Sequence, residues 1–509
     1  MQNFNWKKLQ NGSDIRGVAL AGVPNEAVNL TPEVAQILGQ AFVNWLSQKS
    51  GKPASALTIA VGRDSRLSGP SLTEALMTGM TLSGSAVYNF EMASTPAMFM
   101  STVTSGFECD GAIMITASHL PFNRNGFKFF TPQGGLEKQD ISDILSLAEI
   151  NTFSLAPCPG TVTARDFMSV YAQSLVEKVR QGVNDPDHFD QPLKGLKIIV
   201  DAGNGAGGFY AAQVLEPLGA DTTGSQFLVP DGNFPNHVPN PENAEAMAAI
   251  CQAVLKHQAD LGIIFDTDVD RSAAVDHQGT EFNRNRLIAL MATIVLKEHP
   301  HSTIVTDSIT SDGLTQFIEQ ELQGIHHRFK RGYKNVINES VRLNQNGQES
   351  WLAIETSGHG ALKENYFLDD GAYLVTKLLI ELARLKRQGK SLADLISQLQ
   401  EPAESQEFRL TIQQEDFKTY GNQVIEKLQV FAQTQPDWKL VPNNYEGVRI
   451  ACQSPAENGW FLLRLSLHDP VMPLNIESNT SGGVDKIAKR LFSDFFSSCE
   501  SLDLSAFNR

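Results

Sequence analysis

The chain has 509 residues, of which 41% are apolar and 19% are charged, a balance that fits a globular protein. Its formal net charge of −16 disfavours a nucleic-acid partner, because phosphate backbones are bound by basic surfaces. Small anionic substrates stay compatible with this charge, since they need only a locally basic pocket. At roughly 100–200 residues per domain, the length predicts three or four domains.

Cysteine usage and the longest apolar runs bear on location. The 5 cysteines are scattered and form no CxxC pair, which indicates neither a disulfide framework nor a zinc site and favours a reducing compartment. The N-terminus MQNFNWKKLQ lacks the apolar core of a signal peptide. Apolar runs such as 287–296 are shorter than the roughly 20 residues that cross a bilayer. We expect no membrane association and a cytoplasmic location, or a stromal one if the source has plastids.

One pattern recurs along the chain: a short apolar run leads directly into a loop that contains aspartate. It appears at 57–66, 196–208, 261–271 and 302–310. Runs rich in Ile and Val predict strands buried on both faces, and the segments between them predict helices. The clearest helix is 371–389, with leucines at helical spacing between a candidate N-cap, Asp370, and a candidate stop, Gly389.

Alternating strands and helices predict the α/β class, with mixed, mainly parallel sheets. The C-terminal part differs, because strands at 447–453 and 459–467 precede a final helix and predict a smaller α+β domain. Stretches with proline or glycine at 155–164, and a polar one at 399–407, predict linkers. A third break falls near residue 285.

The first candidate for chemistry is the segment TASHLPFNRNGFKFF, which follows the apolar run 111–115. Ser118 therefore lies on a loop that leaves a strand, next to His119 and ten residues before Lys128. A loop serine acts as a nucleophile only where its surroundings activate it. The setting is not the GxSxG elbow of hydrolases, and by itself the segment also fits an ordinary polar loop.

The second candidate is DTDVDR, which follows another predicted strand. Its alternate aspartates Asp266, Asp268 and Asp270 can converge on one hard cation through carboxylate oxygens. An EF-hand loop is rejected, because its sixth and twelfth positions require Gly and Glu where this chain has Arg271 and His277. Arg271 suits a phosphate that shares the metal. The alternative is a solvated acidic turn.

The segment DAGNGAGG contains Gly203-x-Gly205-x-x-Gly208 after a predicted strand, with Asp221 eighteen residues beyond the first glycine. This spacing matches the dinucleotide-binding fingerprint and supports a rival class, the NAD-dependent oxidoreductases. A lone fingerprint equally fits a tight junction between strand and helix near a phosphate.

Two later loops carry polar groups suited to a sugar phosphate. ETSGHGAL offers Glu355, Ser357 and His359, which can all bind sugar hydroxyls from one loop. RLSLHDP ends a predicted strand and offers Arg464 and Ser466, a combination that binds phosphate. Each segment also fits an ordinary surface turn or an exposed basic residue on a strand.

Taken in chain order, these motifs resemble those of the phosphoglucomutase/phosphomannomutase family, the α-D-phosphohexomutases, over nearly the whole chain. TASHLPFNRNGFK is similar to the family's phosphoserine loop TASHNPxxxNGxK, and DTDVDR to its metal loop DGDGDR. ETSGH is similar to its sugar loop GExSGH, and RLSLHDP to its phosphate loop RxSGTEP. SDIRG and GRDSR match its opening motifs, at 13–17 and 62–66. DAGNGAGG is familiar there too, which weakens the oxidoreductase alternative.

The resemblance implies four domains around a central cleft, which we place at 1–158, 159–285, 286–402 and 403–509. It implies that phosphorylated Ser118 donates its phosphoryl group to a hexose monophosphate, making a bisphosphate that reorients and returns its other phosphoryl group. Mg²⁺ would be held by Ser118, Asp266, Asp268 and Asp270, and a sugar bisphosphate would serve as activator or donor. The other catalytic residues implied are His119, Lys128, Arg16 and Arg271. The substrate would contact Glu355, Ser357, His359, Arg464, Ser466 and His468.

The sequence also departs from the family pattern. Leu120 stands where Asn is usual, and Thr267 and Val269 stand where Gly is usual. In the phosphate loop Gly, Thr and Glu are replaced by Leu467, His468 and Asp469. Two activities therefore stay open: a mutase that interconverts hexose 1- and 6-phosphates, and a glucose-1,6-bisphosphate synthase that uses a donor such as fructose 1,6-bisphosphate. The identity of the hexose (glucose, mannose or glucosamine) and the oligomeric state are also open.

Overall fold

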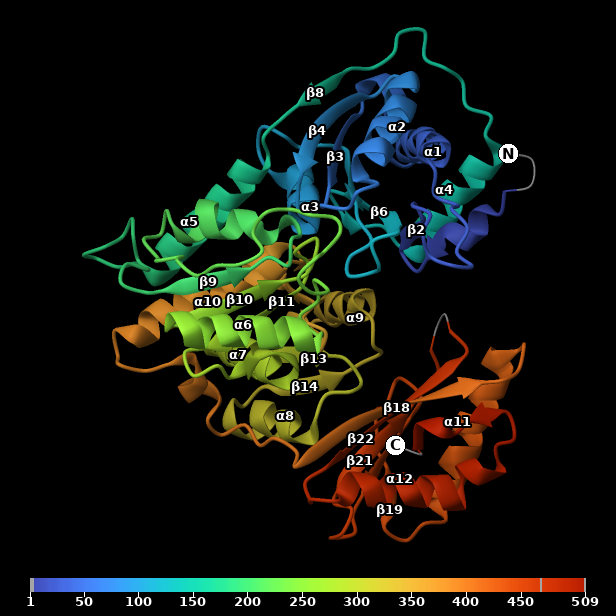
Figure 1. Cartoon of the computed structure of the whole chain (residues 1–509), viewed down its shortest axis with the longest axis vertical. Helices are drawn as coiled ribbons and strands as arrows, with labels where there is room; N and C mark the ends of the chain where they lie inside the picture. The colour runs from blue at the N-terminus through green and yellow to red at the C-terminus, as the bar shows by residue number, and fades with distance from the viewer. Residues whose placement is uncertain (1–3, 467–468, 508–509) are drawn as a thin grey trace. The chain divides into compact units, whose positions relative to one another are not determined.

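The computed structural model describes residues 4–466 and 469–507. The chain forms two compact units: Met1–Asn283 with Ser357–Asp394, and Arg284–Thr356 with Leu395–Arg509. Both units combine sheets with covering helices (Figure 1). The predicted α/β class with a smaller C-terminal α+β part is confirmed, while the four domain boundaries stay a prediction.

The first sheet of the first unit has the strand order β1-β2-β6-β5-β3-β4-β8, with β7 beside β6. Strand β3 pairs in parallel with β4 and β5, whereas β6 runs antiparallel to β2 and β5. The predicted linker 155–164 supplies the edge strand β8, which pairs in parallel with β4. The strands are β1 (Gln10–Asn11), β2 (Asp14–Val18), β3 (Thr58–Arg63), β4 (Ala86–Met92), β5 (Gly111–Ile115), β6 (Arg124–Thr131), β7 (Gly134–Gly135) and β8 (Val162–Ala164).

Helices α1, α2 and α4 share one hydrophobic core with this sheet, in which Phe42, Leu76 and Ile144 meet Ile113 and Phe127. The helices of this part of the chain are α1 (Pro32–Ser50), α2 (Gly69–Leu82), α3 (Thr95–Val103) and α4 (Lys138–Ile150). Ser94 caps α3 by accepting from the Ala97 N–H at 3.3 Å. The loops that carry GRDSR and TASH leave the carboxyl ends of β3 and β5, where open α/β sheets bind ligands.

The second sheet of the first unit has the order β12-β11-β10-β9, with β9 and β10 parallel and the other pairs antiparallel. The DTDVDR loop connects β10 to β11. The strands and helices here are β9 (Ile198–Asp201), β10 (Leu261–Phe265), β11 (Ser272–Asp276), β12 (Glu281–Phe282), α5 (Met168–Val183), η3 (Ala206–Gly208), the π-helix η4 (Tyr210–Leu215) and α6 (Ala244–His257).

Three later elements complete the first unit: β16 (Gly360–Leu362), β17 (Leu368–Asp369) and α10 (Gly371–Lys386). Asp370 caps α10 by accepting from the Tyr373 N–H at 2.9 Å, which confirms the predicted cap. The helix ends at Lys386, before the predicted stop Gly389. Besides η3, the short 3-10 segments of the described residues are η1 (Trp6–Leu9), η2 (Ala54–Ala56), η6 (Lys363–Asn365), η7 (Leu392–Ile396), η8 (Phe496–Ser498) and η9 (Ser505–Phe507).

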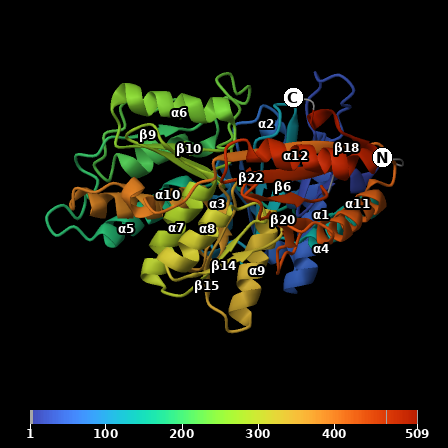
Figure 2. The ribbon, with the colours of Figure 1, turned by 90° about the horizontal axis from the view of Figure 1, so that it is seen from below.

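The second unit begins with three parallel strands, with β13 between β14 and β15. Its C-terminal sheet has the order β19-β20-β21-β22-β18-β23 and is antiparallel throughout its described pairs. Helices α11 and α12 pack on that sheet (Figure 2), so that Leu428 and Leu491 share a core with Phe461. The elements are α7 (Arg284–Glu298), β13 (Thr303–Thr306), α8 (Asp312–Gln316), the π-helix η5 (Phe317–Glu321), β14 (Ile325–Arg328), α9 (Tyr333–Gln345), β15 (Ser350–Ile354), β18 (Glu404–Ile412), α11 (Phe417–Gln433), β19 (Trp438–Leu440), β20 (Val448–Cys452), β21 (Gly459–Leu463), β22 (Val471–Ser478), α12 (Gly483–Asp494) and β23 (Leu502–Asp503).

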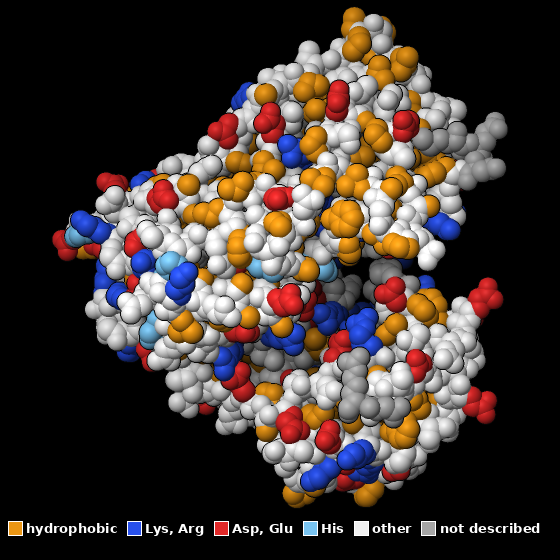
Figure 3. Space-filling model, viewed as in Figure 1, with side chains coloured by type: hydrophobic (Ala, Val, Ile, Leu, Met, Phe, Trp, Pro, Cys, Tyr) orange, Lys and Arg blue, Asp and Glu red, His pale blue; other side chains and the backbone are white. Residues whose placement is uncertain are grey.

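Within the described residues, no helix is both long and apolar enough to cross a bilayer. On the face shown in Figure 3, acidic and basic side chains are interspersed among neutral and apolar ones.

Candidate active site

Ser118 lies on the loop after β5 in a left-handed backbone conformation, with a φ of 50°. A non-glycine residue in this region costs about 1–3 kcal/mol and persists only where the surroundings hold it. The residue is 5% exposed, so its hydroxyl is shielded from bulk water. The Oγ donates to Asp266 Oδ2 at 3.0 Å and accepts from Arg271 Nη2 at 3.0 Å. A strained, buried serine between a carboxylate and a guanidinium is a candidate nucleophile.

The DTDVDR loop has a strained position of its own. Val269 has a φ of 70°, which is unusual for a β-branched residue. Its side chain is fully buried, and its carbonyl accepts from the Gly371 N–H at the start of α10 at 3.1 Å. The burial of the Val269 side chain and the hydrogen bond to its carbonyl together hold this turn. The residue stands where the family pattern has Gly, the residue that adopts this conformation without strain.

The three aspartates of this loop converge as predicted. Their ligand atoms lie within 4.8 Å of one another, and all three side chains are buried. Burial, together with the charges of Asp270 and Asp268, raises the pKa of Asp266 well above its usual range. A proton on one carboxyl or a cation between them relieves the repulsion of three carboxylates held this close.

Lys128 supplies part of the charge that the aspartates need. Its Nζ donates to Asp268 Oδ2 at 3.0 Å and also to Asp270 Oδ2. Thr95 Oγ1 donates to the same oxygen of Asp268 at 2.5 Å. The Oδ1 atoms of Asp268 and Asp270 are buried and find no hydrogen-bond partner among the described residues. Unmatched carboxylate oxygens are the ligands that hard divalent cations prefer, so this cluster fits a metal ion.

His119 is held as a neutral imidazole. Its Nδ1 accepts from Arg271 Nη2 at 2.8 Å and lies 3.4 Å from Ser118 Oγ. Burial, and then the positive charges of Arg271 and Arg16, lower the pKa of His119 to about 3. An imidazole with so low a pKa is a weak base at neutral pH, which disfavours the predicted role of His119 in taking up the hydroxyl proton.

Arg271 and Arg16 both reach the Ser118 loop. Besides its contacts with Ser118 and His119, Arg271 donates to Asp266 Oδ2 at 3.0 Å and to Asn240 Oδ1 at 3.0 Å. Arg16 donates to the carbonyl of Ala117 at 2.7 Å and pairs with Asp14 at 2.9 Å. Arg16 therefore lies beside the loop, as predicted, but its described contact is with the residue before Ser118.

The predicted sugar loop is divided at Thr356 and Ser357 between the two compact units. In the second unit, Glu355 Oε1 accepts from the Gly332 N–H at 2.6 Å. In the first unit, His359 Nδ1 forms an ion pair with Asp369. Burial opposes the charge of His359, but Asp369 and Asp270 raise its pKa to about 9, so the imidazole is positively charged at neutral pH. Ser357 is buried.

The predicted phosphate loop follows β21. Arg464 Nε is buried without a hydrogen-bond partner among the described residues. The Ser466 N–H donates to the Val471 carbonyl at 2.9 Å, and its Oγ accepts from the Asp469 N–H at 3.3 Å. His468 lies outside the described residues. Burial lowers the pKa of Arg464, with Glu446 and Arg331 as its strongest charged neighbours.

The glycine fingerprint has a packing role. A Cβ on Gly205 would lie 2.6 Å from the carbonyl oxygen of Thr267, and one on Gly208 would lie 2.2 Å from that of Leu228. Both distances are too short, so Gly205 lets the loop after β9 press against the DTDVDR loop, and Gly208 lets it approach the backbone of Leu228. The Ala206 N–H then donates to the Thr267 carbonyl at 2.8 Å. The pattern read as a dinucleotide fingerprint therefore supports the aspartate loop.

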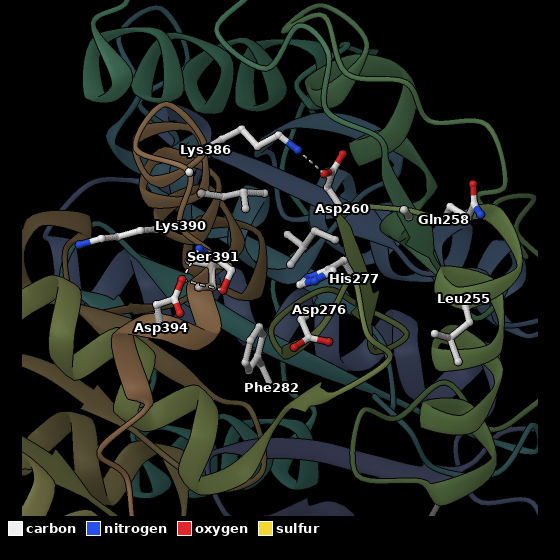
Figure 4. Close-up of a pocket in the computed structure, with 15 residues that line it drawn as sticks. Leu255, Gln258, Asp260, Asp276, His277, Phe282, Lys386, Lys390, Ser391 and Asp394 are labelled. Atoms are coloured by element: carbon white, nitrogen blue, oxygen red, sulfur yellow. Dashed lines mark hydrogen bonds and ion pairs between the residues drawn. The ribbon is translucent and has the colours of Figure 1, made fainter.

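A cavity of about 750 Å³ lies elsewhere in the first unit. It is lined at one end of β10 and α10 by Asp260 and Lys386, which are paired at 2.7 Å, and by His277 and Phe282 (Figure 4). Its lining shares no residue with the site residues predicted from the sequence. We assign the chemistry to the Ser118 cluster instead.

Several residues of the cluster were not singled out from the sequence. They are Thr95, Asn240 and Asp369. Asp64 and Arg66, beneath the Ser118 loop, belong to GRDSR, which was named as an opening motif without a role for either residue. Ser94-Thr95-Pro96 carries the signal of a helix start, because Ser caps and Pro favours the first turn. That signal predicts α3 but not the contact of Thr95 with a residue 173 positions away.

Comparison with known proteins matches three segments to the phosphoglucomutase/phosphomannomutase family: its alpha/beta/alpha domain I at 7–153, domain II at 170–279 and domain III at 283–402. The chain belongs to this family. This match confirms two predictions: that the chain is an α-D-phosphohexomutase family member, and that it is an enzyme that acts on hexose phosphates.

Individual relatives agree with the family match over nearly the full length. The chain is 30% identical to a phosphoglucomutase of Neisseria gonorrhoeae over 484 residues, covering 94% of each. It is 31% identical to a phosphomannomutase/phosphoglucomutase of Pseudomonas putida over 478 residues, covering 93% of this chain and 92% of the relative. A crystal structure of a phosphoglucomutase/phosphomannomutase family protein from Burkholderia thailandensis matches with a TM-score of 0.76 and 27% identity, covering 96% and 97% of the two chains.

Proposed function

We propose that the chain is a phosphoglucomutase/phosphomannomutase-type enzyme that transfers a phosphoryl group between Ser118 and a hexose phosphate. The observation that carries this proposal is the setting of Ser118 Oγ, 3.0 Å from both Asp266 Oδ2 and Arg271 Nη2. Catalysis of phosphoryl transfer depends mainly on positioning and on stabilising charge at the transferring group. A buried serine with a fixed guanidinium and a carboxylate cluster beside it supplies both.

The proposed step breaks the bond between phosphorus and Ser118 Oγ and forms a bond between phosphorus and a hydroxyl oxygen of the sugar monophosphate. Ser118 leaves as a hydroxyl, and the sugar becomes a bisphosphate. After the bisphosphate reorients, Ser118 Oγ attacks the other phosphoryl group, and the sugar monophosphate that leaves is the isomer of the substrate. Arg271 is placed to hold the phosphoryl oxygens throughout, because its Nη2 already contacts Ser118 Oγ.

Lys128 is our candidate for handling the hydroxyl proton. Its Nζ lies within the aspartate cluster, and the ammonium can take up the hydroxyl proton only as it passes one of its own protons to a carboxylate such as Asp268, to which it donates at 3.0 Å. The low pKa of His119 makes that imidazole a weak base. His119 instead orients Arg271 by accepting its N–H, and Arg16 holds the preceding carbonyl of the loop.

Ser118, Asp266, Asp268 and Asp270 would hold a Mg²⁺ ion. The Oδ1 atoms of Asp268 and Asp270 support this assignment, because neither accepts a hydrogen bond among the described residues, and the nearest cation recorded for Asp270 Oδ1 is Arg271 Nε at 3.9 Å. When bound, the ion would neutralise charge on the transferring phosphoryl group. Lys128 donates to two of the same carboxylates, so we expect metal binding to redistribute those contacts.

The substrate would be held by two groups of residues. Glu355, Ser357 and positively charged His359 would bind sugar hydroxyls, and Arg464, Ser466 and His468 would bind the phosphate that does not react. Beside Arg464, Arg331 adds positive charge, and the Glu446 carboxylate balances part of it. The cytoplasmic location and the sugar bisphosphate activator stay predictions.

The activity is tested by ³¹P NMR of the protein with Mg²⁺ and glucose 1-phosphate. One sample contains a trace of glucose 1,6-bisphosphate, and another contains excess fructose 1,6-bisphosphate. Build-up of glucose 6-phosphate in the first sample is the result we expect. Accumulation of glucose 1,6-bisphosphate in the second would establish the synthase activity that the altered residues 467–469 leave open. Samples with mannose 1-phosphate and glucosamine 1-phosphate identify the hexose, and no turnover of any of them would contradict the proposal.

A further inference from the structure

Arg66 lies beneath the loop that carries Ser118 and donates both terminal nitrogens of its guanidinium to that loop. Its side chain is 0% exposed. Nη1 donates to the carbonyls of Pro121 and Arg124 at 2.8 and 2.9 Å. Nη2 donates to the carbonyls of Leu120, at 2.6 Å, and of Ser118. One buried side chain therefore satisfies four carbonyls of a single loop, which water would otherwise have to solvate.

Asp64 connects Arg66 to the other side of Ser118. Its Oδ2 lies 3.3 Å from Arg66 Nε and accepts from Thr116 Oγ1 at 2.7 Å. Its Oδ1 accepts from the backbone N–H of Arg66 at 2.9 Å. The Thr116 hydroxyl in turn accepts from the Ser118 N–H at 2.9 Å. A closed ring of contacts thus runs from the Ser118 N–H through Thr116, Asp64 and Arg66 back to the Ser118 carbonyl.

This ring holds both backbone polar groups of the residue whose φ is 50°. Such a conformation persists where the surroundings over-determine it, and a fully buried ring with two charged members does so. Phe234 closes the ring from outside, with its ring centroid 5.3 Å from the Arg66 guanidinium. The two charges compensate each other, so removing one leaves the other buried and unpaired.

We propose that Arg66, Asp64 and Thr116 are positioning residues that fix Ser118 Oγ in the geometry for phosphoryl transfer, a role that rests on the proposed function of Ser118. Their contacts with Ser118 are to its N–H and carbonyl, not to its hydroxyl. Displacing a reacting atom by about 1 Å can cost about 100-fold in rate. Loss of the ring should therefore lower kcat and leave the KM for the hexose phosphate nearly unchanged.

The matched pair Thr116→Val and Thr116→Ser tests the ring with least disturbance, because valine keeps the volume and serine keeps the hydroxyl. We expect Thr116→Val to lower kcat by about 10- to 100-fold with KM changed by less than about threefold. We expect Thr116→Ser to stay within about threefold of the wild type. A purely structural role would instead lower the melting temperature of Thr116→Val and leave kcat per folded molecule unchanged.

Arg66→Lys gives the second test, since it keeps the charge and loses the fork that reaches four carbonyls. Its control is Arg63→Lys, because Arg63 donates to the carbonyl of its neighbour Asp64, at 3.3 Å, rather than to the Ser118 loop. We expect Arg66→Lys to lower kcat by at least as much as Thr116→Val, and Arg63→Lys to behave as the wild type. If Arg66→Lys does not fold, the Thr116 pair decides.

Intact-mass analysis of each protein after exposure to a hexose bisphosphate distinguishes failure of the positioning role from failure of the proposed phosphoryl transfer by Ser118. A wild-type enzyme that turns over without phosphorylated Ser118 would overturn both. A wild type phosphorylated at Ser118, together with Thr116→Val and folded Arg66→Lys at wild-type kcat, would overturn the positioning role alone.

Discussion

The Ser118 cluster and the phosphate loop after β21 differ in how far the protein itself completes their contacts. Around Ser118, buried side chains hold the hydroxyl, the N–H and the carbonyl, and Lys128 already lies among the aspartates. In the phosphate loop, Arg464 Nε is buried without a described partner. The comparison indicates that the protein itself holds the hydroxyl and the backbone of Ser118, whereas the Oδ1 atoms of Asp268 and Asp270 and the Nε of Arg464 are left for ligands.

The largest effect we expect is from Lys128→Met, which removes a cation from the Ser118 cluster. It leaves buried carboxylates uncompensated, so we expect a loss of about 3–5 kcal/mol in stability and about 100- to 1000-fold in kcat. Mg²⁺ should restore the melting temperature but not kcat. The control is Lys52→Met, whose exposed pair with Asp110 contributes about 0–1 kcal/mol. Equal kcat values in the two variants would contradict the assignment.

The next largest effect concerns Arg464 in the phosphate loop, which we propose binds the phosphate of the substrate. Arg464→Met should raise the KM for the hexose phosphate by about 10- to 100-fold, because a charged hydrogen bond contributes about 1.5–3 kcal/mol. The variant should keep wild-type stability, since the protein makes little use of this guanidinium. Arg409→Met, which removes an exposed arginine paired with Glu407 in the same unit, is the matched control. A fall in kcat at unchanged KM would indicate that Arg464 acts on the reacting groups, and it would contradict a role of Arg464 in substrate recognition.

A smaller effect tests the strain in the aspartate loop. At Val269, Gly should be more stable than Ala by about 1 kcal/mol, because the φ of 70° strains every residue with a Cβ. At Val275, a buried residue of β11 in ordinary strand geometry, Ala should be more stable than Gly by about 0.5–1 kcal/mol. Urea unfolding of the four variants measures both differences. The same order at the two positions would show that Val269 is unstrained.

The smallest effect is a pH dependence of stability at His237. Burial alone would lower the pKa of His237, but its hydrogen bonds with Asp201 and the charge of that carboxylate raise it. Below the unfolded pKa of about 6.5 this pair should stabilise the protein fully, and the contribution should vanish as pH rises through the raised folded pKa. The difference in melting temperature between the wild type and His237→Gln should therefore shrink with rising pH. A difference that is constant or grows would mean that His237 is neutral.

Much of the fold could be predicted because its signals are local. The runs 111–115 and 261–265 form β5 and β10 as expected, and Asp370 caps α10. The stretch 155–164 was predicted as a linker, because three exposed residues of an edge strand carry no pattern, yet part of it forms β8.

The reactive and charged residues of the candidate site could be predicted, because each of its loops carries a motif that is visible in the sequence. The partners that hold those loops were not, since Arg66 meets Ser118 across 52 positions and Thr95 meets Asp268 across 173. The left-handed conformation of Val269 could not be predicted either, because a β-branched residue disfavours it. The roles assigned to the site residues stay predictions until they are tested.

The most direct test of the central claim is intact-mass analysis of the wild type and Ser118→Ala after incubation with Mg²⁺ and glucose 1,6-bisphosphate. We predict one phosphoryl group on the wild type, located at Ser118 by peptide mapping and lost when excess glucose 1-phosphate is added. Ser118→Ala should carry none and should be inactive. An unphosphorylated wild type, with Ser118→Ala equally active, would contradict the mechanism proposed for this chain.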